Sequence, residues 1–202
     1  MTELVTNQDL DPDRLRAAFG IFPTGVVAVA AQVGGELVGL AASSFTSVSL
    51  DPPLVSISIA RTSKTWPDLR RSGRLGVTVL ADHHGDVCRQ LAGEPERRFD
   101  GLPVRVHDGA VTLEDGLARF ECSVFAEVGA GDHVLVLLRL HLVDHSDTSG
   151  PLVFHRSAFG RVEGSEQRLE REQRDRHRRD GVALDGAALG GGASGLQGHG
   201  SG

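Results

Sequence analysis

The sequence predicts a mainly β fold, an antiparallel barrel with a few short helices packed outside it. Runs rich in β-branched residues follow one another at short intervals, and glycine or proline turns separate them. Few segments space their apolar residues as a helix does. A doubly wound parallel sheet would need a helix between most strands, and that alternation is missing.

A short helix is expected at the start, after Asp11 and before Gly20. Asp11 is suited to cap the helix and Pro12 to occupy its first position, because proline has no N–H to lose there. An amphipathic stripe of apolar residues follows, formed by Leu15, Ala18 and Phe19.

Eight strands are expected after this helix, over residues 24–33, 36–42, 46–50, 54–60, 75–80, 111–113, 118–128 and 133–144. Gly34-Gly35 makes a hairpin turn between the first two, and Asp51-Pro52-Pro53 separates the next pair. Two more helices are expected at 65–72 and 83–92.

The length of 202 residues indicates one domain with extensions. We expect a flexible N-terminus over 1–10, the domain over 11–162, a charged helix or coil over 163–180 and a disordered glycine-rich tail over 181–202. The tail contains Gly190-x-Gly192-x-x-Gly195, which matches a dinucleotide fingerprint in letters only, because no strand precedes it.

Composition excludes several classes of protein. A net charge of −6 argues against a protein that grips nucleic acid or an anionic membrane. No apolar run suits a membrane span or a leader, so a cytoplasmic location is expected. Cys88 and Cys122 are expected to be reduced thiols. Two groups of histidine and aspartate, around His83 and His141, fit no metal-ligand spacing, so no metal site is predicted.

Two polar clusters are candidates for ligand binding. Residues 43–49 carry five hydroxyls between apolar strands, and on a buried sheet these groups need partners, either a polar ligand or neighbouring backbone. Residues 61–65 read Arg-Thr-Ser-Lys-Thr before a predicted helix and include the chain's single lysine, Lys64. They favour either a phosphate site or a capped helix start. One ligand with an aromatic head and a phosphate tail could reach both clusters.

A third candidate is His133, which opens a long strand after the turn Gly131-Asp132. It could position a substrate or be merely solvated. The sequence contains no nucleophile elbow and no HExxH helix, so hydrolysis has no visible machinery.

Five motifs in order resemble a known family. They are Phe22-Pro-Thr-Gly-Val26, the run from Gly39 to Leu54, Arg61-Thr-Ser-Lys-Thr65, Ala130-Gly-Asp-His133 and Pro151-Leu-Val-Phe154. Together they resemble the short-chain NAD(P)H:flavin oxidoreductases of the flavin reductase-like family, over residues 10 to 162. Arg98-Phe-Asp-Gly101 also looks like a family segment, with no role assigned.

The resemblance implies an FMN-binding split barrel, a homodimer, and a reductase that supplies reduced flavin to a partner monooxygenase. FMN or FAD would be reduced by NADH or NADPH. The residues implied to border the flavin ring are Ala41, Ala42, Ser43, Ser44, Phe45, Ser47 and Val48. Those implied to hold its phosphate are Thr62, Ser63, Lys64 and Thr65. His133, as the catalytic residue, and Arg156 and Phe159 would contact the nicotinamide nucleotide.

The sequence departs from the family pattern at two positions. Leu138 stands where a small residue is common, and Phe159 where tyrosine is common. Two alternatives stay open: a split-barrel oxidoreductase that retains its flavin and acts on another substrate, and a non-catalytic flavin- or haem-binding protein.

Overall fold

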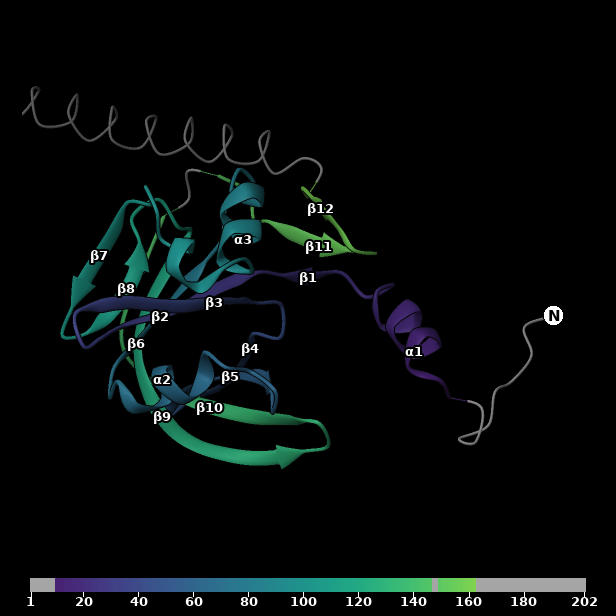
Figure 1. The fold of residues 1–202 in the computed structure, drawn as a ribbon, viewed down its shortest axis with the longest axis horizontal. Coiled ribbons are helices and arrows are strands. Elements are labelled where there is room, and N and C mark those ends of the chain that lie inside the picture. The colour runs from purple at the N-terminus through teal and green to yellow at the C-terminus, as the bar shows by residue number, and fades with distance from the viewer. Residues whose placement is uncertain (1–9, 147–148, 163–202) are drawn as a thin grey trace, which may run out of the picture. The chain divides into compact units, whose positions relative to one another are not determined.

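Every strand pair in the described part of the chain is antiparallel, which confirms the predicted mainly β fold (Figure 1). The computed structural model describes residues 10–146 and 149–162. The predictions for residues 1–9, 163–180 and 181–202 lie outside the described residues.

Twelve strands and three α-helices make up this part of the chain. The strands are β1 (Thr24–Gly25), β2 (Val27–Val33), β3 (Glu36–Ala42), β4 (Thr46–Leu50), β5 (Pro53–Ala60), β6 (Leu75–Val79), β7 (Val104–His107), β8 (Ala110–Leu113), β9 (Ala118–Ala130), β10 (His133–His145), β11 (Val153–His155) and β12 (Ala158–Gly160). The helices are α1 (Pro12–Phe19), α2 (Trp66–Arg71) and α3 (Gly85–Leu91), and a 3₁₀ turn covers Pro95–Arg97.

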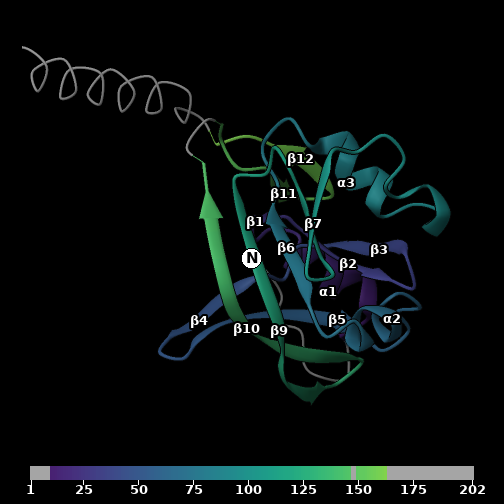
Figure 2. The same ribbon diagram turned by 90° about the vertical axis from the view of Figure 1, so that its left-hand side faces the viewer.

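Nine strands form one sheet in the order β4-β5-β10-β9-β6-β2-β8-β7, with β3 on β2, and β1-β11-β12 form a small second sheet. The longest strands, β9 and β10, make a hairpin that pairs with β5 on one side and β6 on the other (Figure 2). Helix α2 packs against β2 and β3, and α3 packs against β3.

Strand β2 is buried on both faces. Its residues Val27, Val29 and Ala31 belong to a core cluster that includes Ile57, Leu75 and Val136, whereas Ala28 belongs to a second cluster with Leu80 and Leu91. A strand covered on both sides needs no alternation of apolar and polar residues, which explains the continuous apolar run in the sequence.

The structure differs from the predicted elements at several places. The strand expected over 24–33 is divided at Val26, whose carbonyl accepts a hydrogen bond from the Leu80 N–H outside the ladder. Strands β7, β11 and β12 and the 3₁₀ turn were not predicted. Strands of three or four residues are too short to leave a recognisable period.

Trp66 and the two cysteines are buried. Trp66 anchors α2, because its ring is in the core and its indole Nε1–H donates to the Glu127 carboxylate on β9 at 3.0 Å. Cys88 and Cys122 are free thiols, and burial raises the pKa of Cys122 to about 12. Among the described helices, none combines the length and apolar character needed to cross a bilayer.

Gly76 provides a test of the packing between β6 and β8. A Cβ on Gly76 would lie 2.0 Å from the Val111 carbonyl oxygen, which is backbone and cannot move aside cheaply. We expect Gly76→Ala to lower the free energy of unfolding by more than about 2 kcal/mol, measured by urea denaturation. Gly25→Ala is the matched control, because its Cβ would meet nothing within 4 Å. Equal stability of the two variants would contradict this account.

Candidate functional site

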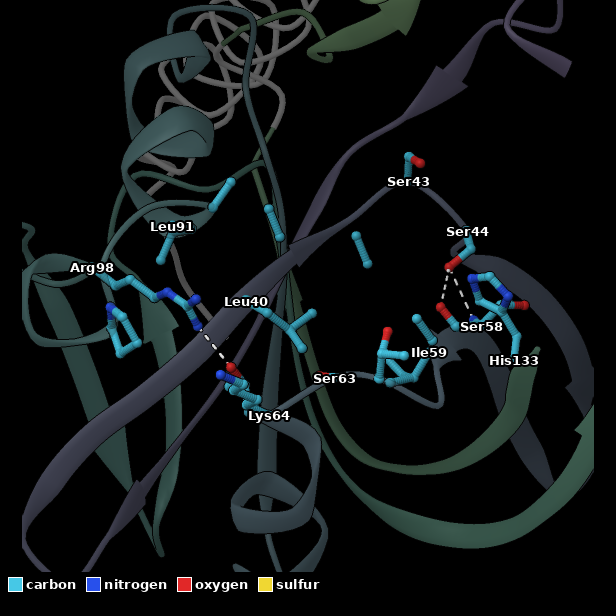
Figure 3. A pocket seen from close by; sticks show the side chains of 17 residues that line it. Leu40, Ser43, Ser44, Ser58, Ile59, Ser63, Lys64, Leu91, Arg98 and His133 are labelled. Atoms are coloured by element: carbon cyan, nitrogen blue, oxygen red, sulfur yellow. Dashed lines mark hydrogen bonds between the residues drawn. The ribbon is translucent and has the colours of Figure 1, made fainter. Parts of the chain in front are cut away.

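A cavity of about 630 Å³ lies between the end of β3, the end of β5 and the residues after α3 (Figure 3). Nine of the predicted site residues line it: Ala41, Ala42, Ser43, Ser44, Thr62, Ser63, Lys64, Thr65 and His133. The two polar clusters, about 20 residues apart in the sequence, therefore meet at one cavity. Its volume is in the range typical of small-molecule sites.

The first wall is the end of β3 and the loop that follows. The Ser44 hydroxyl accepts a hydrogen bond from the Ser58 N–H at 2.9 Å and donates to the Ser58 carbonyl at 3.2 Å. Ser44 therefore bonds to neighbouring backbone and ties the loop to β5. Within the described residues, the Ser43 hydroxyl has no protein partner and remains available to a ligand.

The expectation that residues 43–49 lie on a buried sheet is wrong. Of the five residues with hydroxyls in this segment, Ser43, Thr46 and Ser47 are exposed. The other two, Ser44 and Ser49, are partly buried. The reason is the sheet order, which puts β4 at an edge.

The second wall is the turn between β5 and α2. The Ser63 N–H donates to the Ala60 carbonyl, and the Ser63 hydroxyl accepts from the Trp66 N–H at 3.2 Å. In residues 10–146 and 149–162, no protein acceptor is recorded for the amide N–H groups of Thr62, Lys64 and Thr65. This segment therefore offers free backbone donors beside the Lys64 ammonium group.

Arg98 closes the third side of the cavity and was not among the predicted site residues. Its guanidinium Nη1 donates to the Thr65 hydroxyl at 2.8 Å (Figure 3). The same Nη1 donates to the Gly39 carbonyl at 2.8 Å, and Nε donates to the Gly93 carbonyl at 3.0 Å. Arg98 thus links β3 to the turn before α2. The signal was present in the sequence, because Arg98 begins the segment Arg98–Gly101 for which no role was assigned.

Gly39 allows this contact because it has no side chain. A Cβ at this position would lie 2.6 Å from the Phe99 ring and 2.9 Å from the Val29 carbonyl oxygen. Phe99 itself packs against the second core cluster. The segment that carries Arg98 can therefore lie directly on β3.

His133 lines the cavity at the start of β10. Its Nδ1 lies 2.8 Å from the Asp132 carboxylate, and this hydrogen bond lowers the pKa of Asp132 below its usual value. The bond leaves Nε2 as the ring nitrogen available to a ligand. Figure 3 shows the imidazole at the same end of the cavity as Ser44 and Ser58.

Apart from Phe159, four of the predicted residues are not among those that line the 630 Å³ cavity: Phe45, Ser47, Val48 and Arg156. Phe45 stacks on Phe120 with ring centroids 5.9 Å apart, whereas Ser47 and Val48 are exposed on β4. Arg156 is at the exposed turn between β11 and β12, and its N–H donates to the Gly20 carbonyl.

Phe159 lines a second cavity of about 270 Å³, which shares Ala41, Ala42, Ser43 and Ala92 with the first. The Arg89 guanidinium lies over the Phe159 ring, 5.2 Å from its centroid. Arg89, which sequence reasoning missed, therefore adds a cationic group beside this aromatic ring.

Within residues 10–146 and 149–162, one group of side chains has metal-ligand character: His83, His84 and Asp115. The His84 Nδ1 accepts a hydrogen bond from the Ala81 N–H at 2.9 Å, so the neutral ring carries its hydrogen on Nε2. That Nε2 lies 3.1 Å from the Asp115 carboxylate and has no lone pair for a metal. The group is better suited to joining two loops than to holding a cation.

The fold and the cavity define a mainly β protein with one cavity lined by hydroxyls, a lysine, an arginine and a histidine. The family model for the flavin reductase like domain matches residues 19–163. The chain belongs to this family, and the resemblance read from the five motifs is confirmed.

Individual relatives agree with this assignment. A flavin reductase from Pseudomonas putida is 37% identical over 158 residues, which are 77% of this chain and 93% of the relative. The reductase subunit of a flavin-dependent monooxygenase from Rhodococcus jostii is 31% identical and covers 79% of this chain and 82% of its own. The solved structure of an NADH:FAD oxidoreductase from Streptomyces globisporus has a TM-score of 0.73 at 31% identity, covering 80% of this chain and 98% of that one.

Proposed function

We propose that this chain is an NAD(P)H:flavin oxidoreductase that reduces FMN or FAD and supplies the reduced flavin to a monooxygenase component. One observation carries the proposal. In a flavin reductase fold, a single cavity gathers Lys64, Arg98 and His133 with several hydroxyls, and no carboxylate is among its lining residues. Such a lining suits an anionic ligand, although the whole chain has a net charge of −6.

The flavin phosphate fits the turn at 62–65. The free amides of Thr62, Lys64 and Thr65, the Lys64 ammonium group and the Arg98 guanidinium all present donors to one region. Phosphate oxygens accept such charge-assisted hydrogen bonds. Helix α2 has only six residues, and Thr65 makes no side-chain cap, so these specific donors support phosphate binding better than the helix end does.

The flavin ring fits the opposite end of the cavity, along Ala41, Ala42 and Ser43. These small side chains leave the β3 backbone accessible to a flat ring, and the Ser43 hydroxyl is available to bond it. Ser44 holds this wall in place through Ser58 instead of through the ligand.

The nicotinamide nucleotide fits between His133 and Phe159, because the two cavities adjoin at Ala41, Ala42 and Ser43. When both cofactors are bound, they supply the chemistry, a hydride transfer from nicotinamide to flavin with a proton taken from solvent. The protein contributes proximity and orientation. Phe159 offers an aromatic face, and the His133 Nε2 offers a polar contact.

A turnover assay tests the function. The protein is mixed with FMN or FAD and with NADH or NADPH, and absorbance at the nicotinamide band is followed. We expect many turnovers per protein with at least one pair. A protein that stays yellow through dialysis and turns over only with another acceptor would favour a flavin-retaining oxidoreductase. No oxidation with any pair would favour a non-catalytic binding protein and overturn the proposal.

Lys64→Ala tests the phosphate end of the cavity. Loss of one charge-assisted hydrogen bond is expected to raise the Kd for FMN roughly five- to twentyfold, measured by fluorescence quenching. Riboflavin lacks the phosphate, so its Kd is expected to change less than about twofold. Lys64→Arg keeps the charge and serves as the control. An equal effect on both flavins would remove Lys64 from the phosphate site.

We further propose that the protein is a homodimer. The segment around the end of α1 leaves Phe19, Ile21 and Phe22 exposed by 57–74%, and Leu50 on the edge strand β4 is 96% exposed. Apolar side chains this exposed favour contact with another protein surface. Light scattering is expected to give twice the chain mass of 21.4 kDa, and Phe22→Ser with Leu50→Ser to shift the mass toward one chain. A wild-type monomer would contradict this.

A further inference from the structure

Arg61 connects the turn at 62–65 to the turn before His133, although it does not line the cavity. It is the residue directly after β5 and before the proposed phosphate turn. Its backbone N–H donates to the Asp132 carbonyl, and its side-chain Nε donates to the Gly131 carbonyl, both at 2.9 Å. Arg61 therefore makes two hydrogen bonds to a turn that is far from it in the sequence.

The turn that Arg61 holds is otherwise exposed. Gly129, Ala130, Gly131 and Asp132 all face solvent, and Gly131 has a left-handed backbone with φ of +63°. The pairing of β10 with β5 ends at His133 and Ala60, and Gly129 and Ala130 pair with Val134 and His133 at the end of the β9–β10 hairpin, so Gly131 and Asp132 lie beyond both ladders. An exposed turn past the last ladder pair is prone to local opening.

Gly129 shows that the guanidinium lies close against this turn. A Cβ on Gly129 would lie 2.8 Å from the Arg61 Nη2, so a larger residue would push the arginine away. The absence of a side chain at 129 is what lets Arg61 reach the Gly131 carbonyl.

His133 depends on the same turn. Its imidazole is held by the side chain of Asp132, and the Asp132 backbone is held by Arg61. On the other side of Arg61, Thr62 and Ser63 line the cavity at the proposed phosphate turn. A change at Arg61 would therefore move the His133 ring relative to that turn without removing any group from the cavity.

We propose that Arg61 is a positioning residue, which fixes the Gly131–His133 turn and so keeps the His133 ring oriented toward a nicotinamide nucleotide in the cavity. This inference rests on the proposed function. Arg61 acts through His133 and has no contact with the ligands in its own right. The guanidinium contributes a hydrogen bond of defined direction, and its positive charge is secondary.

A double-mutant cycle with His133 tests the proposal. We expect His133→Ala and Arg61→Ala each to raise the KM for NADH about tenfold at saturating flavin, with a smaller effect on kcat. In the His133→Ala background, adding Arg61→Ala should change the KM less than twofold, because its effect passes through the missing ring. If the increases in KM caused by the two substitutions multiply in the double variant, Arg61 acts independently of His133 and the proposal fails.

Amide hydrogen exchange of the ligand-free protein supplies a readout that does not depend on activity. Peptides covering 129–134 should exchange at least threefold faster in Arg61→Ala than in the wild type. Arg74→Ala is the control, because Arg74 bonds Asp108 between two other elements and lies outside the cavity. Unchanged exchange in Arg61→Ala would overturn the proposal even if the KM rises.

Two further variants keep the test decisive. If Arg61→Ala fails to fold, Gly129→Ala displaces the guanidinium while the arginine remains, and it should raise both the exchange rate and the KM. Arg61→Lys keeps the charge but loses the directed hydrogen bond of the guanidinium. A normal KM together with fast exchange in this variant would mean that only the charge matters, and it would overturn the proposal. If the wild type oxidises no NADH with either flavin, the proposed function fails, whereas the exchange experiment still tests the contact of Arg61 with the turn.

Discussion

The burial of β2 on both faces is the constraint on which the rest of the structure depends. This strand separates two core clusters and pairs with β3 on one side and with β6 and β8 on the other. Because β3 is in register with β2 along its whole length, from Glu36 to Ala42, the end of β3 has a fixed position. Ala41 and Ala42 reach the cavity there, and they are shared by both cavities. Close approaches at Gly39 and Gly76 allow neighbouring segments to lie directly on this central layer.

Local charge, set by three separate segments, decides what the cavity can hold. Lys64 comes from the turn before α2, Arg98 from the segment after α3, and His133 from the β9–β10 hairpin. Arg98 reaches across to the Thr65 hydroxyl, and Arg61 reaches across to the hairpin turn. Two arginines thus bind these segments together by hydrogen bonds to backbone and hydroxyl oxygens. The resulting cavity lining is cationic within a protein whose net charge is −6, so the proposed attraction of an anionic cofactor is a short-range effect.

Most elements could be predicted from the sequence, because apolar runs, glycine turns and a capped helix leave local signals. Seven of the predicted strands, from 36–42 to 133–144, correspond closely to single strands, whereas the run at 24–33 is divided at Val26. The site was predicted through its motifs, and nine of those residues meet at one cavity. Phe45, Ser47 and Val48 belong to the same motif but point elsewhere, because β4 turns to the edge of the sheet. No local pattern distinguishes a residue before such a turn from one after it.

By itself, the sequence determined the fold class, the family and the two polar segments that line the cavity, because these depend on short motifs and on the periodicity of apolar residues. Only the tertiary structure decided that Arg98 completes the cavity, that Arg89 lies over the Phe159 ring, and that Arg61 holds the turn of His133. Each of these contacts joins residues that are between 33 and 70 positions apart in the sequence. An arginine carries no sequence signal for the partner it will reach, since that partner is set by how the strands pack.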